Sequence, residues 1–273
     1  LKAVRNSGLV GLGGAGFPTH VKLSLPEGVT VDTLVVNAAE CEPYITSDYR
    51  ELIENSSDFI SGLCKILEIM GINRAFVGIE DNKPEAIRLL KELSSNDNRI
   101  EVVKLDSRYP QGAEKMLIYA LTGRKVPPGK LPLDVGTVVM NVNSVSFVDK
   151  YLKTGMPLTK KRVTVDGSAV ASPSNVEVLI GTQLEDVFEF CGGFKAEPAK
   201  VLMGGPMMGV SQYSLQTSVI KNTNALLALD AKDADLGKES PCIRCGKCIE
   251  ACPMNLLPLY INLNVLKEDM EEL

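Results

Sequence analysis

Short apolar runs alternate with helical patterns over residues 33–154, and this alternation restricts the fold more than any other feature of the sequence. Four runs have the length and composition of buried strands: 33–37, 74–79, 100–105 and 137–141. Apolar residues at three- and four-residue spacing predict a helix that Gly71 ends, and Pro84 opens another behind Asn82 as its cap. Two more helices are predicted, one from about residue 112 to Gly123 and one after the fourth run. Strands that alternate with helices predict a layered α/β domain with a mainly parallel sheet.

The pattern changes near Met156. Two strand-like runs (162–165 and 176–180) and a helix (183–190) predict a compact β-rich unit of the β-grasp kind. The segment 201–208, rich in glycine and methionine, is expected to pack back on the neighbouring unit. Residues 221–240 carry little pattern and are interpreted as a connector, and a final helix is predicted over 256–272. We therefore expect three regions: 1–155, 156–220 and 221–273.

Length and charge exclude several classes of function. A chain of 273 residues is longer than one hydrophobic core usually organises. Its formal net charge of −5 and the lack of a basic stripe argue against nucleic acid as a partner. No apolar run reaches the roughly 18 to 20 residues that span a bilayer. With one histidine in the sequence, a Ser-His-Asp triad is disfavoured and a histidine-rich metal site is excluded.

Four of the seven cysteines have the spacing of a bacterial ferredoxin: Cys242, Cys245, Cys248 and Cys252, the last followed by proline. In that pattern three thiolates hold one [4Fe–4S] cluster, and the fourth ligates the other cluster of a two-cluster unit. Zinc is the lesser alternative, because zinc sites favour two separated C-x2-C pairs. No second run occurs before Leu273, so we expect either that the chain continues or that the cluster is incomplete. Clustered cysteines indicate a reducing, cytosolic compartment, and the scattered Cys41, Cys64 and Cys191 are interpreted as structural.

A glycine loop, defined here as residues 11–16, satisfies G-x-G-x-x-G. The usual Rossmann connection is disfavoured, because a short helix is predicted before the loop and Pro18 follows it. Four glycines in six residues leave the backbone bare, so its N–H groups can approach a phosphate or a flat ring. The alternative is a tight turn that only lets elements pack closely. Lys22, six residues later, either meets a phosphate or is a solvated charge.

Polar residues follow three of the predicted strands, where ligands of open α/β sheets bind. Asn37, Glu40 and Glu42 follow the first strand. Residues 109–114 follow the third, and Asn141 with Asn143 ends the fourth. Carboxylates and amides at such an edge suit the hydroxyls of a ribose or ribityl chain and a ring edge. The alternative is a set of polar loops that face water.

Four segments together resemble a known family: 11–23 (GLGGAGFPTHVKL), 36–50 (VNAAECEPYITSDYR), 109–116 (YPQGAEKM) and 241–258 (PCIRCGKCIEACPMNLLP). They are similar to the C subunit of the Rnf electron-transport complex, whose flavin domain is similar to the NADH-binding flavoprotein subunit of respiratory complex I. The resemblance covers essentially the whole chain. It implies a Rossmann-like, parallel-sheet FMN/NADH domain, then a small β-grasp (SLBB) domain, then a helical ferredoxin-like region with two [4Fe–4S] clusters.

The resemblance also implies the site residues. Those expected to contact FMN are Gly11, Gly13, Gly14, Gly16, Lys22 (at the phosphate), Asn37, Glu40, Tyr109, Gly112, Ala113, Asn141 and Asn143. Phe17, Glu42 and Glu114 are expected to contact the nicotinamide nucleotide, and no side chain is expected to act as a catalytic acid or base. Three polar groups of the complex I pattern are absent: Leu12 replaces Arg, Ala39 replaces Asp, and Ala113 replaces Glu.

The function that the resemblance implies is electron input to a membrane-bound redox complex. Electrons would pass between NADH and iron–sulfur clusters through FMN, in an NAD:ferredoxin oxidoreductase coupled to ion translocation. The expected partners are the other subunits of an Rnf-type complex, NADH, and ferredoxin or a ferredoxin-like subunit, at the cytoplasmic side of the membrane. Two alternatives stay open: a cobalamin reductase of a bacterial microcompartment, and a non-enzymatic docking subunit with a vestigial flavin pocket.

Overall fold

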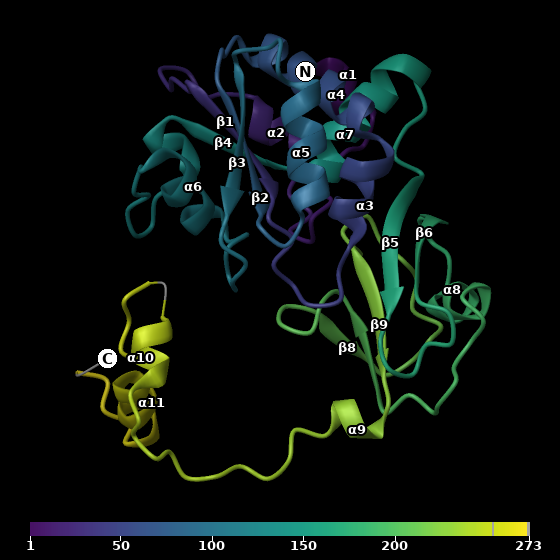
Figure 1. Ribbon diagram of the computed structural model, residues 1–273, viewed down its shortest axis with the longest axis vertical. Coiled ribbons are helices and arrows are strands. Elements are labelled where there is room, and N and C mark those ends of the chain that lie inside the picture. The colour runs from purple at the N-terminus through teal and green to yellow at the C-terminus, as the bar shows by residue number, and fades with distance from the viewer. Residues whose placement is uncertain (253, 272–273) are drawn as a thin grey trace. The chain divides into compact units, whose positions relative to one another are not determined.

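The computed structural model describes residues 1–252 and 254–271. The chain forms two compact units, Leu1–Ala234 and Asp235–Leu273 (Figure 1). The larger unit holds two sheets, one within the first predicted region and one that combines strands of the second region with a strand of the third. The region boundaries predicted from the sequence stay predictions.

The first sheet is parallel throughout. Its strands are β1 (Thr33–Ala38), β2 (Ala75–Glu80), β3 (Ile100–Leu105) and β4 (Thr137–Asn141), in the order β3-β2-β1-β4. The predicted parallel α/β fold is therefore confirmed. Strand β1 lies inside the sheet, and its register places Asn37 opposite Asn141 of β4. Two of the predicted polar strand ends thus meet at one sheet edge.

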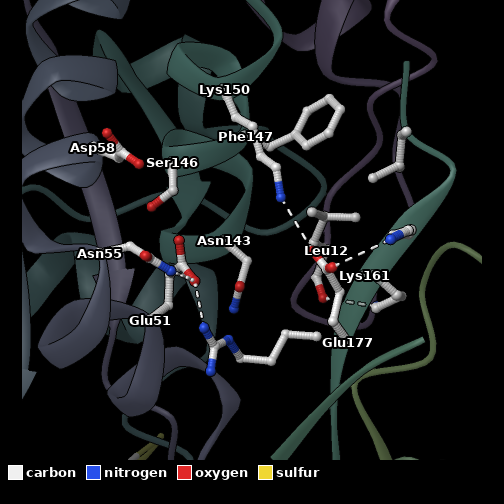
Figure 2. Close-up of a pocket in the computed structure, with 13 residues that line it drawn as sticks. Leu12, Glu51, Asn55, Asp58, Asn143, Ser146, Phe147, Lys150, Lys161 and Glu177 are labelled. Carbon is white, nitrogen blue, oxygen red and sulfur yellow. Dashed lines mark hydrogen bonds and ion pairs between the residues drawn. The ribbon is translucent and has the colours of Figure 1, made fainter. Parts of the chain in front are cut away.

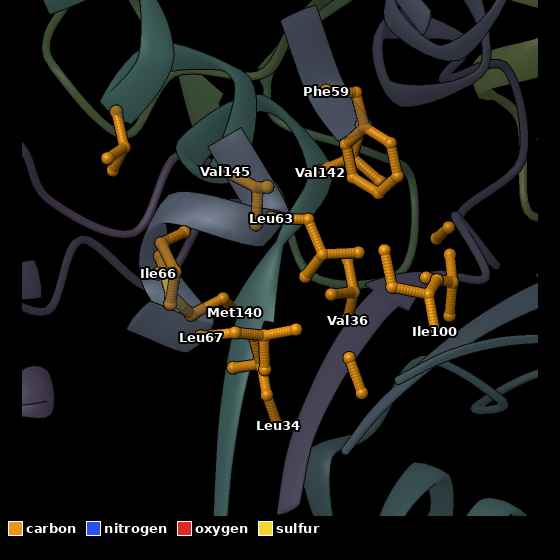
Figure 3. Close-up of a cluster of buried hydrophobic side chains, with 14 of the residues drawn as sticks. Leu34, Val36, Phe59, Leu63, Ile66, Leu67, Ile100, Met140, Val142 and Val145 are labelled. Atoms are coloured by element: carbon orange, nitrogen blue, oxygen red, sulfur yellow. The ribbon is translucent and has the colours of Figure 1, made fainter. Parts of the chain in front are cut away.

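Helices cover both faces of this sheet (Figure 1). One face packs on α3 (Ser47–Glu54), α4 (Ser56–Met70), α5 (Pro84–Leu93) and α7 (Val142–Thr154), and the other on α6 (Glu114–Thr122). Side chains alternate along β1, so Leu34 and Val36 join the first core and Val35 joins the second. Figure 3 shows the first core, where Phe59 and Leu63 of α4 pack with Val36 and Val142.

The helix boundaries correct the sequence analysis in three places. The single helix predicted up to Gly71 is two helices, α3 and α4, which Asn55 separates with a non-helical backbone (φ −125°, ψ 31°). The residue that precedes α5 as its cap is Lys83, not Asn82. Helix α6 begins at Glu114, two residues later than predicted. The helix ends at Gly71 and Gly123 are as predicted, because both glycines adopt the left-handed conformation that ends a helix.

The second sheet has five strands in the order β6-β5-β9-β7-β8. They are β5 (Lys160–Asp166), β6 (Ser174–Leu179), β7 (Lys200–Met203), β8 (Val210–Gln212) and β9 (Ala225–Leu229). Helix α8 (Leu184–Phe190) packs its apolar residues on this sheet, which gives the predicted β-grasp architecture. The connector predicted for residues 221–240 is partly wrong, because every residue of β9 is buried and the strand lies between β5 and β7.

The smaller unit contains α10 (Lys247–Ala251) and α11 (Pro258–Leu266). The final helix is therefore shorter than the predicted 256–272, and Pro253 and Glu272 lie outside the described residues. Short helices α1 (Lys2–Asn6), α2 (Thr19–Leu23) and α9 (Ala231–Ala234) belong to the larger unit. Among the described residues, no helix combines the length and apolar character needed to cross a membrane.

Candidate functional site

The glycine loop lies against the first turn of α7, just beyond the end of β4. The Leu12 N–H donates to Ser144 Oγ (2.9 Å), and a Cβ added at Gly13 would come within 2.8 Å of Asn141 Nδ2. Asn141 is the N-cap of α7, and its side chain accepts from the Ser144 N–H. A side chain at position 13 would require Asn141 to move, so the bare backbone of glycine lets the loop pack directly on the N-terminus of the helix. The loop stands between α1 and α2, which agrees with the sequence argument against a Rossmann connection.

Three successive amides of the glycine loop are free to bind an anion. Gly11 N–H donates to Phe17 O and Gly16 N–H to Gly11 O, which closes the loop. Within the part of the chain that the structure describes, the N–H groups of Gly13, Gly14 and Ala15 make no hydrogen bond. Free loop amides beside a helix N-terminus form a common site for a phosphate group.

Lys22 lies beside β4 and the start of α6. Its Nζ donates to Val139 O of β4 (2.9 Å) and pairs with Glu114 Oε1 (3.3 Å). The side chain is 30% exposed, so the ammonium stays accessible to a ligand. The structure thus brings Gly13 and Asn141 together at the end of β4, and Lys22 binds the backbone of the same strand at Val139. Backbone amides and a lysine ammonium are donors that suit a phosphate group.

The segment after β3 packs on the end of β1. Asn37 Nδ2 donates to Gly112 O (2.8 Å), and Gly112 N–H donates to Cys41 Sγ (3.3 Å). A Cβ at Gly112 would lie 3.3 to 3.4 Å from Cys41 and Asn37, tighter than an ordinary side-chain contact. Asn37, Cys41 and Gly112 therefore form one compact group at the sheet edge, with Ala113 next to it as the N-cap of α6.

Glu40 turns its carboxylate into the protein. It accepts the N–H groups of Asp48 (2.6 Å) and Tyr49 (3.0 Å), both in the first turn of α3. Its backbone φ of 49° lies in the left-handed region that non-glycine residues rarely adopt. Burial and the nearby Asp48 carboxylate raise the pKa of Glu40 well above its usual value. The predicted contact between Glu40 and FMN stays a prediction, but its carboxylate already holds the start of α3.

Asp48 is a buried site residue that the sequence analysis did not assign. Its carboxylate accepts from Asn141 Nδ2 (2.7 Å) and Asn143 Nδ2 (2.5 Å), so it fixes both amides at the start of α7. Burial raises the pKa of Asp48 to about 6, although both asparagine hydrogen bonds lower it. The only sequence signal was its place inside the segment 36–50 that carries the resemblance.

A cavity of about 600 Å³ opens beyond the carboxyl ends of β1, β2 and β3. Three predicted site residues line it: Glu40, Glu42 and Tyr109. Glu42 Oε2 accepts the Met207 N–H (2.9 Å), whereas its buried Oε1 has no partner among the described residues. The predicted return of segment 201–208 to its neighbouring unit is confirmed by this bond. Of the three residues expected to contact the nicotinamide nucleotide, Glu42 lines this cavity, whereas Phe17, which is 48% exposed, and Glu114 do not.

A second cavity, of about 270 Å³, lies between α3, α7, the start of β5 and the second half of β6. Figure 2 shows Asn143 and Leu12 at its wall, with Lys161 reaching in from β5. Lys161 is only 5% exposed, and burial lowers its pKa to about 7. Arg162 pairs there with Glu51 (3.3 Å) and Glu54 (2.6 Å). Asn143 is the one predicted site residue in this wall, among those the structure describes.

The four clustered cysteines belong to the smaller unit, and none of these four described residues forms a disulfide. Cys242, Cys245 and Cys248 are exposed, and the Arg244 N–H donates to Cys242 Sγ (3.4 Å). Among the described residues, no three cysteine, histidine or acidic side chains are gathered closely enough to hold a metal ion. Thiolate donors at this spacing, with a backbone N–H on one sulfur, suit an iron–sulfur cluster; their assignment as ligands stays a prediction.

Sequence models of three domain families match the chain. They are described as "Nuo51 FMN-binding domain" (residues 4–150), "SLBB domain" (162–211) and "4Fe-4S binding domain" (238–257). The first covers the parallel sheet and the glycine loop, the second covers most of the second sheet, and the third contains the clustered cysteines. Their order is the order expected from the sequence.

Curated relatives match over nearly all of the chain. The C subunit of the proton-translocating ferredoxin:NAD(+) oxidoreductase complex of Clostridium ljungdahlii is 47% identical over 100% of this chain. The C subunit of the Na(+)-translocating ferredoxin:NAD(+) oxidoreductase complex of Acetobacterium woodii is 46% identical over 95% of it. The chain spans 59% of the length of each of these two relatives. The C subunit of an ion-translocating oxidoreductase complex of Rhodobacter capsulatus is 38% identical over 98% of this chain and 52% of that protein.

Solved structures share the fold. An NAD+-reducing [NiFe]-hydrogenase in its H2-reduced state superposes with a TM-score of 0.68 over 85% of this chain and 46% of the hydrogenase chain. The same hydrogenase in its air-oxidized state gives a TM-score of 0.66 over the same shares. Sequence identity is 23% and 22%, so this likeness establishes the arrangement of the elements and no further property.

Proposed function

This chain belongs to the family of C subunits of ion-translocating ferredoxin:NAD(+) oxidoreductase complexes, and on that premise we propose that it passes electrons between NADH and iron–sulfur clusters. It has an FMN-binding domain and a 4Fe-4S binding domain. The chain spans 59% of its first relatives, so the oxidoreductase activity, the substrates and the partner subunits of the whole protein are part of the proposal.

The chemistry requires a centre that exchanges two electrons on one side and one electron on the other. Bound FMN supplies this exchange, because it can accept a hydride and release single electrons. The protein binds and orients the groups. In the proposal the free amides of the glycine loop, the N-terminus of α7 and Lys22 hold the phosphate, while Asn37 and Gly112 line the ring.

In the proposal the nicotinamide nucleotide binds next to FMN, because the cavity that contains Glu42 is also lined by Glu40 and Tyr109, which the resemblance assigns to FMN. The cavity lined by Glu40, Glu42 and Tyr109 lies beyond the strand ends, where nucleotides bind in open α/β sheets. Lys83 also lines this cavity, where its Nζ pairs with Glu80 Oε2 (3.0 Å) and donates to Ala39 O (3.0 Å). Hydrogen-bond donors and acceptors therefore both face the cavity, as the sugar hydroxyls of a dinucleotide require.

The observation that supports the proposal is the glycine loop, with its free amides, at the N-terminus of α7. Three loop amides without a partner among the described residues lie beside the N-terminus of a 13-residue helix, and a lysine ammonium binds the backbone of β4, the strand that leads into this helix.

The test uses the full-length protein purified without oxygen. We expect a yellow protein that contains FMN and iron and whose flavin absorbance bleaches when NADH is added. Replacing Lys22 with methionine should weaken FMN binding by roughly 10- to 100-fold, the usual effect of one charged hydrogen bond. Lys115→Met is the matched control, because Lys115 also donates to a backbone carbonyl, Pro127 O (3.1 Å), away from the loop.

Two results would contradict the proposal. A colourless protein that ignores added FMN would identify a docking subunit. A protein that binds FMN but shows no change of flavin absorbance with NADH would exclude NADH as the electron donor. Oxidation of reduced ferredoxin with NAD(+), measured on the assembled complex, determines the net direction of electron flow.

A further inference from the structure

Two backbone carbonyls of the glycine loop, those of Leu12 and Gly14, are contacted by residues that lie outside the FMN-binding domain. We propose that Lys161 and Asn222 are positioning residues for the FMN phosphate: they hold loop carbonyls and thereby aim the loop amides at the ligand. This inference rests on the proposed FMN site and extends it to the second sheet. Lys161 belongs to β5, and Asn222 lies just before β9.

Two hydrogen bonds connect this region directly to the loop. Asn222 Nδ2 donates to Gly14 O (3.0 Å), and Lys161 Nζ approaches Leu12 O at 3.5 Å (Figure 2). Lys161 Nζ also donates to Lys221 O (2.9 Å), so it fixes the backbone next to Asn222. Lys221 in turn donates to Gly8 O (2.6 Å), just before the loop. One lysine thus holds the loop on one side and the segment that carries Asn222 on the other.

Peptide geometry turns these contacts into an orientation of the amides. The C=O and N–H of one trans peptide unit lie in one plane and point in opposite directions. The Leu12 carbonyl shares its peptide unit with the Gly13 N–H, and the Gly14 carbonyl shares its unit with the Ala15 N–H. When Lys161 and Asn222 hold the two carbonyls, the two amides point away from the second sheet. Within the described residues, neither amide has a partner in the protein.

The packing around the loop leaves little freedom. A Cβ added at Gly16 would lie 3.3 Å from the Asn222 Cβ, so the side chain of Asn222 already touches the loop. Gly14 and Gly16 have φ values of +115° and +67°, a region in which other residues are strained. Lys161 is 5% exposed, which is unusual for a lysine. Its ammonium binds backbone carbonyls inside the protein instead of solvent.

FMN and riboflavin distinguish a positioning role from general support of the fold. The two flavins share the ring and the ribityl chain and differ only in the phosphate. We expect Asn222→Asp and Lys161→Met, made in the full-length protein, to weaken FMN binding about five- to tenfold, the effect of one hydrogen bond. Riboflavin binding should change by less than about twofold. Asn222→Asp keeps the size of the side chain but removes its donor and adds a negative charge that would itself repel the phosphate. Asn222→Leu, which removes the donor and adds no charge, is therefore measured beside it and should weaken FMN binding by a similar factor.

Lys160→Met is the control for the lysine variant. Lys160 is the neighbour of Lys161 in β5, its side chain is 54% exposed, and it pairs with Glu177 (3.7 Å) instead of the loop. We expect both flavins to bind this variant as they bind the wild-type protein. The thermal midpoint of the flavin-free protein is measured for each variant, and Asn222→Asp carries the test if Lys161→Met does not fold.

The outcomes separate this inference from the proposed function. A wild-type protein that binds neither flavin would overturn the proposed function and the inference with it. A wild-type protein that binds FMN, with variants that bind it equally well, would overturn the inference alone. Equal weakening of FMN and riboflavin would also overturn it, because it would show that the two residues support the fold without aiming the amides at the phosphate.

Discussion

Two ionisable side chains of opposite charge are buried behind the glycine loop. Asp48 is held by Asn141 and Asn143, and Lys161 is held by backbone carbonyls. Burial raises the pKa of Asp48 to about 6 and lowers the pKa of Lys161 to about 7, while the attraction between the two charges opposes both shifts. The interior behind the site therefore changes its charge near neutral pH, unlike a core of apolar residues.

The raised pKa of Asp48 predicts a pH dependence of stability. Its folded-state pKa of about 6 exceeds the ordinary aspartate value of 3.8, so between these values the folded protein binds the proton more tightly than the unfolded chain. The stability that Asp48 contributes is therefore full below about pH 4 and is lost as the pH rises to 6 and above. Asp48→Asn should remove this loss. The free energy of unfolding of the variant, relative to wild type, should rise from about pH 4.5 to about pH 7.

Denaturant unfolding of the flavin-free protein at both pH values measures this difference. Asp81→Asn is the control, because Asp81 is exposed and its hydrogen bonds from Ser107 lower its pKa instead of raising it. Stability from such a group is lost as the pH falls, so the control should not show a gain at the higher pH. A relative stability of Asp48→Asn that stays constant or falls with pH would contradict the assignment of a raised pKa to Asp48.

At the scale of elements, the closest helix packing behind the sheet depends on one glycine. Gly62 of α4 faces the backbone of α7, and an added Cβ would overlap the Val145 carbonyl oxygen. Gly62→Ala should therefore force the helices apart and lower the free energy of unfolding by about 1–3 kcal/mol, the usual cost of an overpacked core. Ser57→Ala, at an exposed position of the same helix, should change it by less than about 0.5 kcal/mol. An unchanged stability of Gly62→Ala would show that α4 and α7 are less tightly packed.

Strand β9 provides the second test at this scale. Leu226 is fully buried in the core of the second sheet, whereas Leu236, ten residues later, is 90% exposed. Leu226→Ala should lower the free energy of unfolding by about 2–5 kcal/mol, and Leu236→Ala by less than about 0.5 kcal/mol. Equal, small effects of the two substitutions would support the connector that the sequence analysis predicted. Thermal or denaturant unfolding of the flavin-free protein measures both.

Helices and strands that a local sequence pattern marks could be predicted. The strands of the parallel sheet are apolar runs, and Gly71 and Gly123 end helices because each adopts a left-handed backbone. Strand β9 was missed because Ala-Leu-Leu-Ala-Leu lacks the β-branched residues that mark a strand, and because its parallel partner β5 lies about 60 residues earlier. The break between α3 and α4 was missed because apolar spacing continues across Asn55.

The residues of the candidate site also fall into those that a local sequence pattern predicted and those that it did not. Strand order explains why Asn37 and Asn141, at the ends of parallel strands, could be expected at one edge. Asp48, Lys161 and Asn222 reach the site only through contacts between distant segments, so no local pattern marks them. The spacing of the four cysteines is readable in the sequence, whereas the positions of their sulfur atoms are not.

At the scale of the molecule, the two sheets of the larger unit meet through hydrogen bonds next to the site. Thr46 N–H donates to Thr164 Oγ1 (3.1 Å), Asn175 Nδ2 donates to Thr46 Oγ1 (2.8 Å), and Met207 N–H donates to Glu42 (2.9 Å). A smaller apolar cluster joins Ile45 to residues of β7 and β9. Ligand sites commonly form where two such bodies meet. We therefore treat residues 1–234 as one functional body, with the second sheet as part of the site.

The separation of residues 1–234 from the rest of the chain predicts which truncated proteins fold and bind FMN. All buried apolar clusters of the described residues lie within 1–234, whereas the four cysteines lie beyond it. A protein that ends at Ala234 should keep the thermal midpoint of its flavin-free form and bind FMN within about twofold of the full-length protein. It should contain no iron. A protein that ends at Ile220 lacks β9, the strand between β5 and β7, and should neither fold its second sheet nor bind FMN. If the two truncated proteins bound FMN equally well, the second sheet would not belong to the site; if the longer one lost FMN, the smaller unit would be required for it.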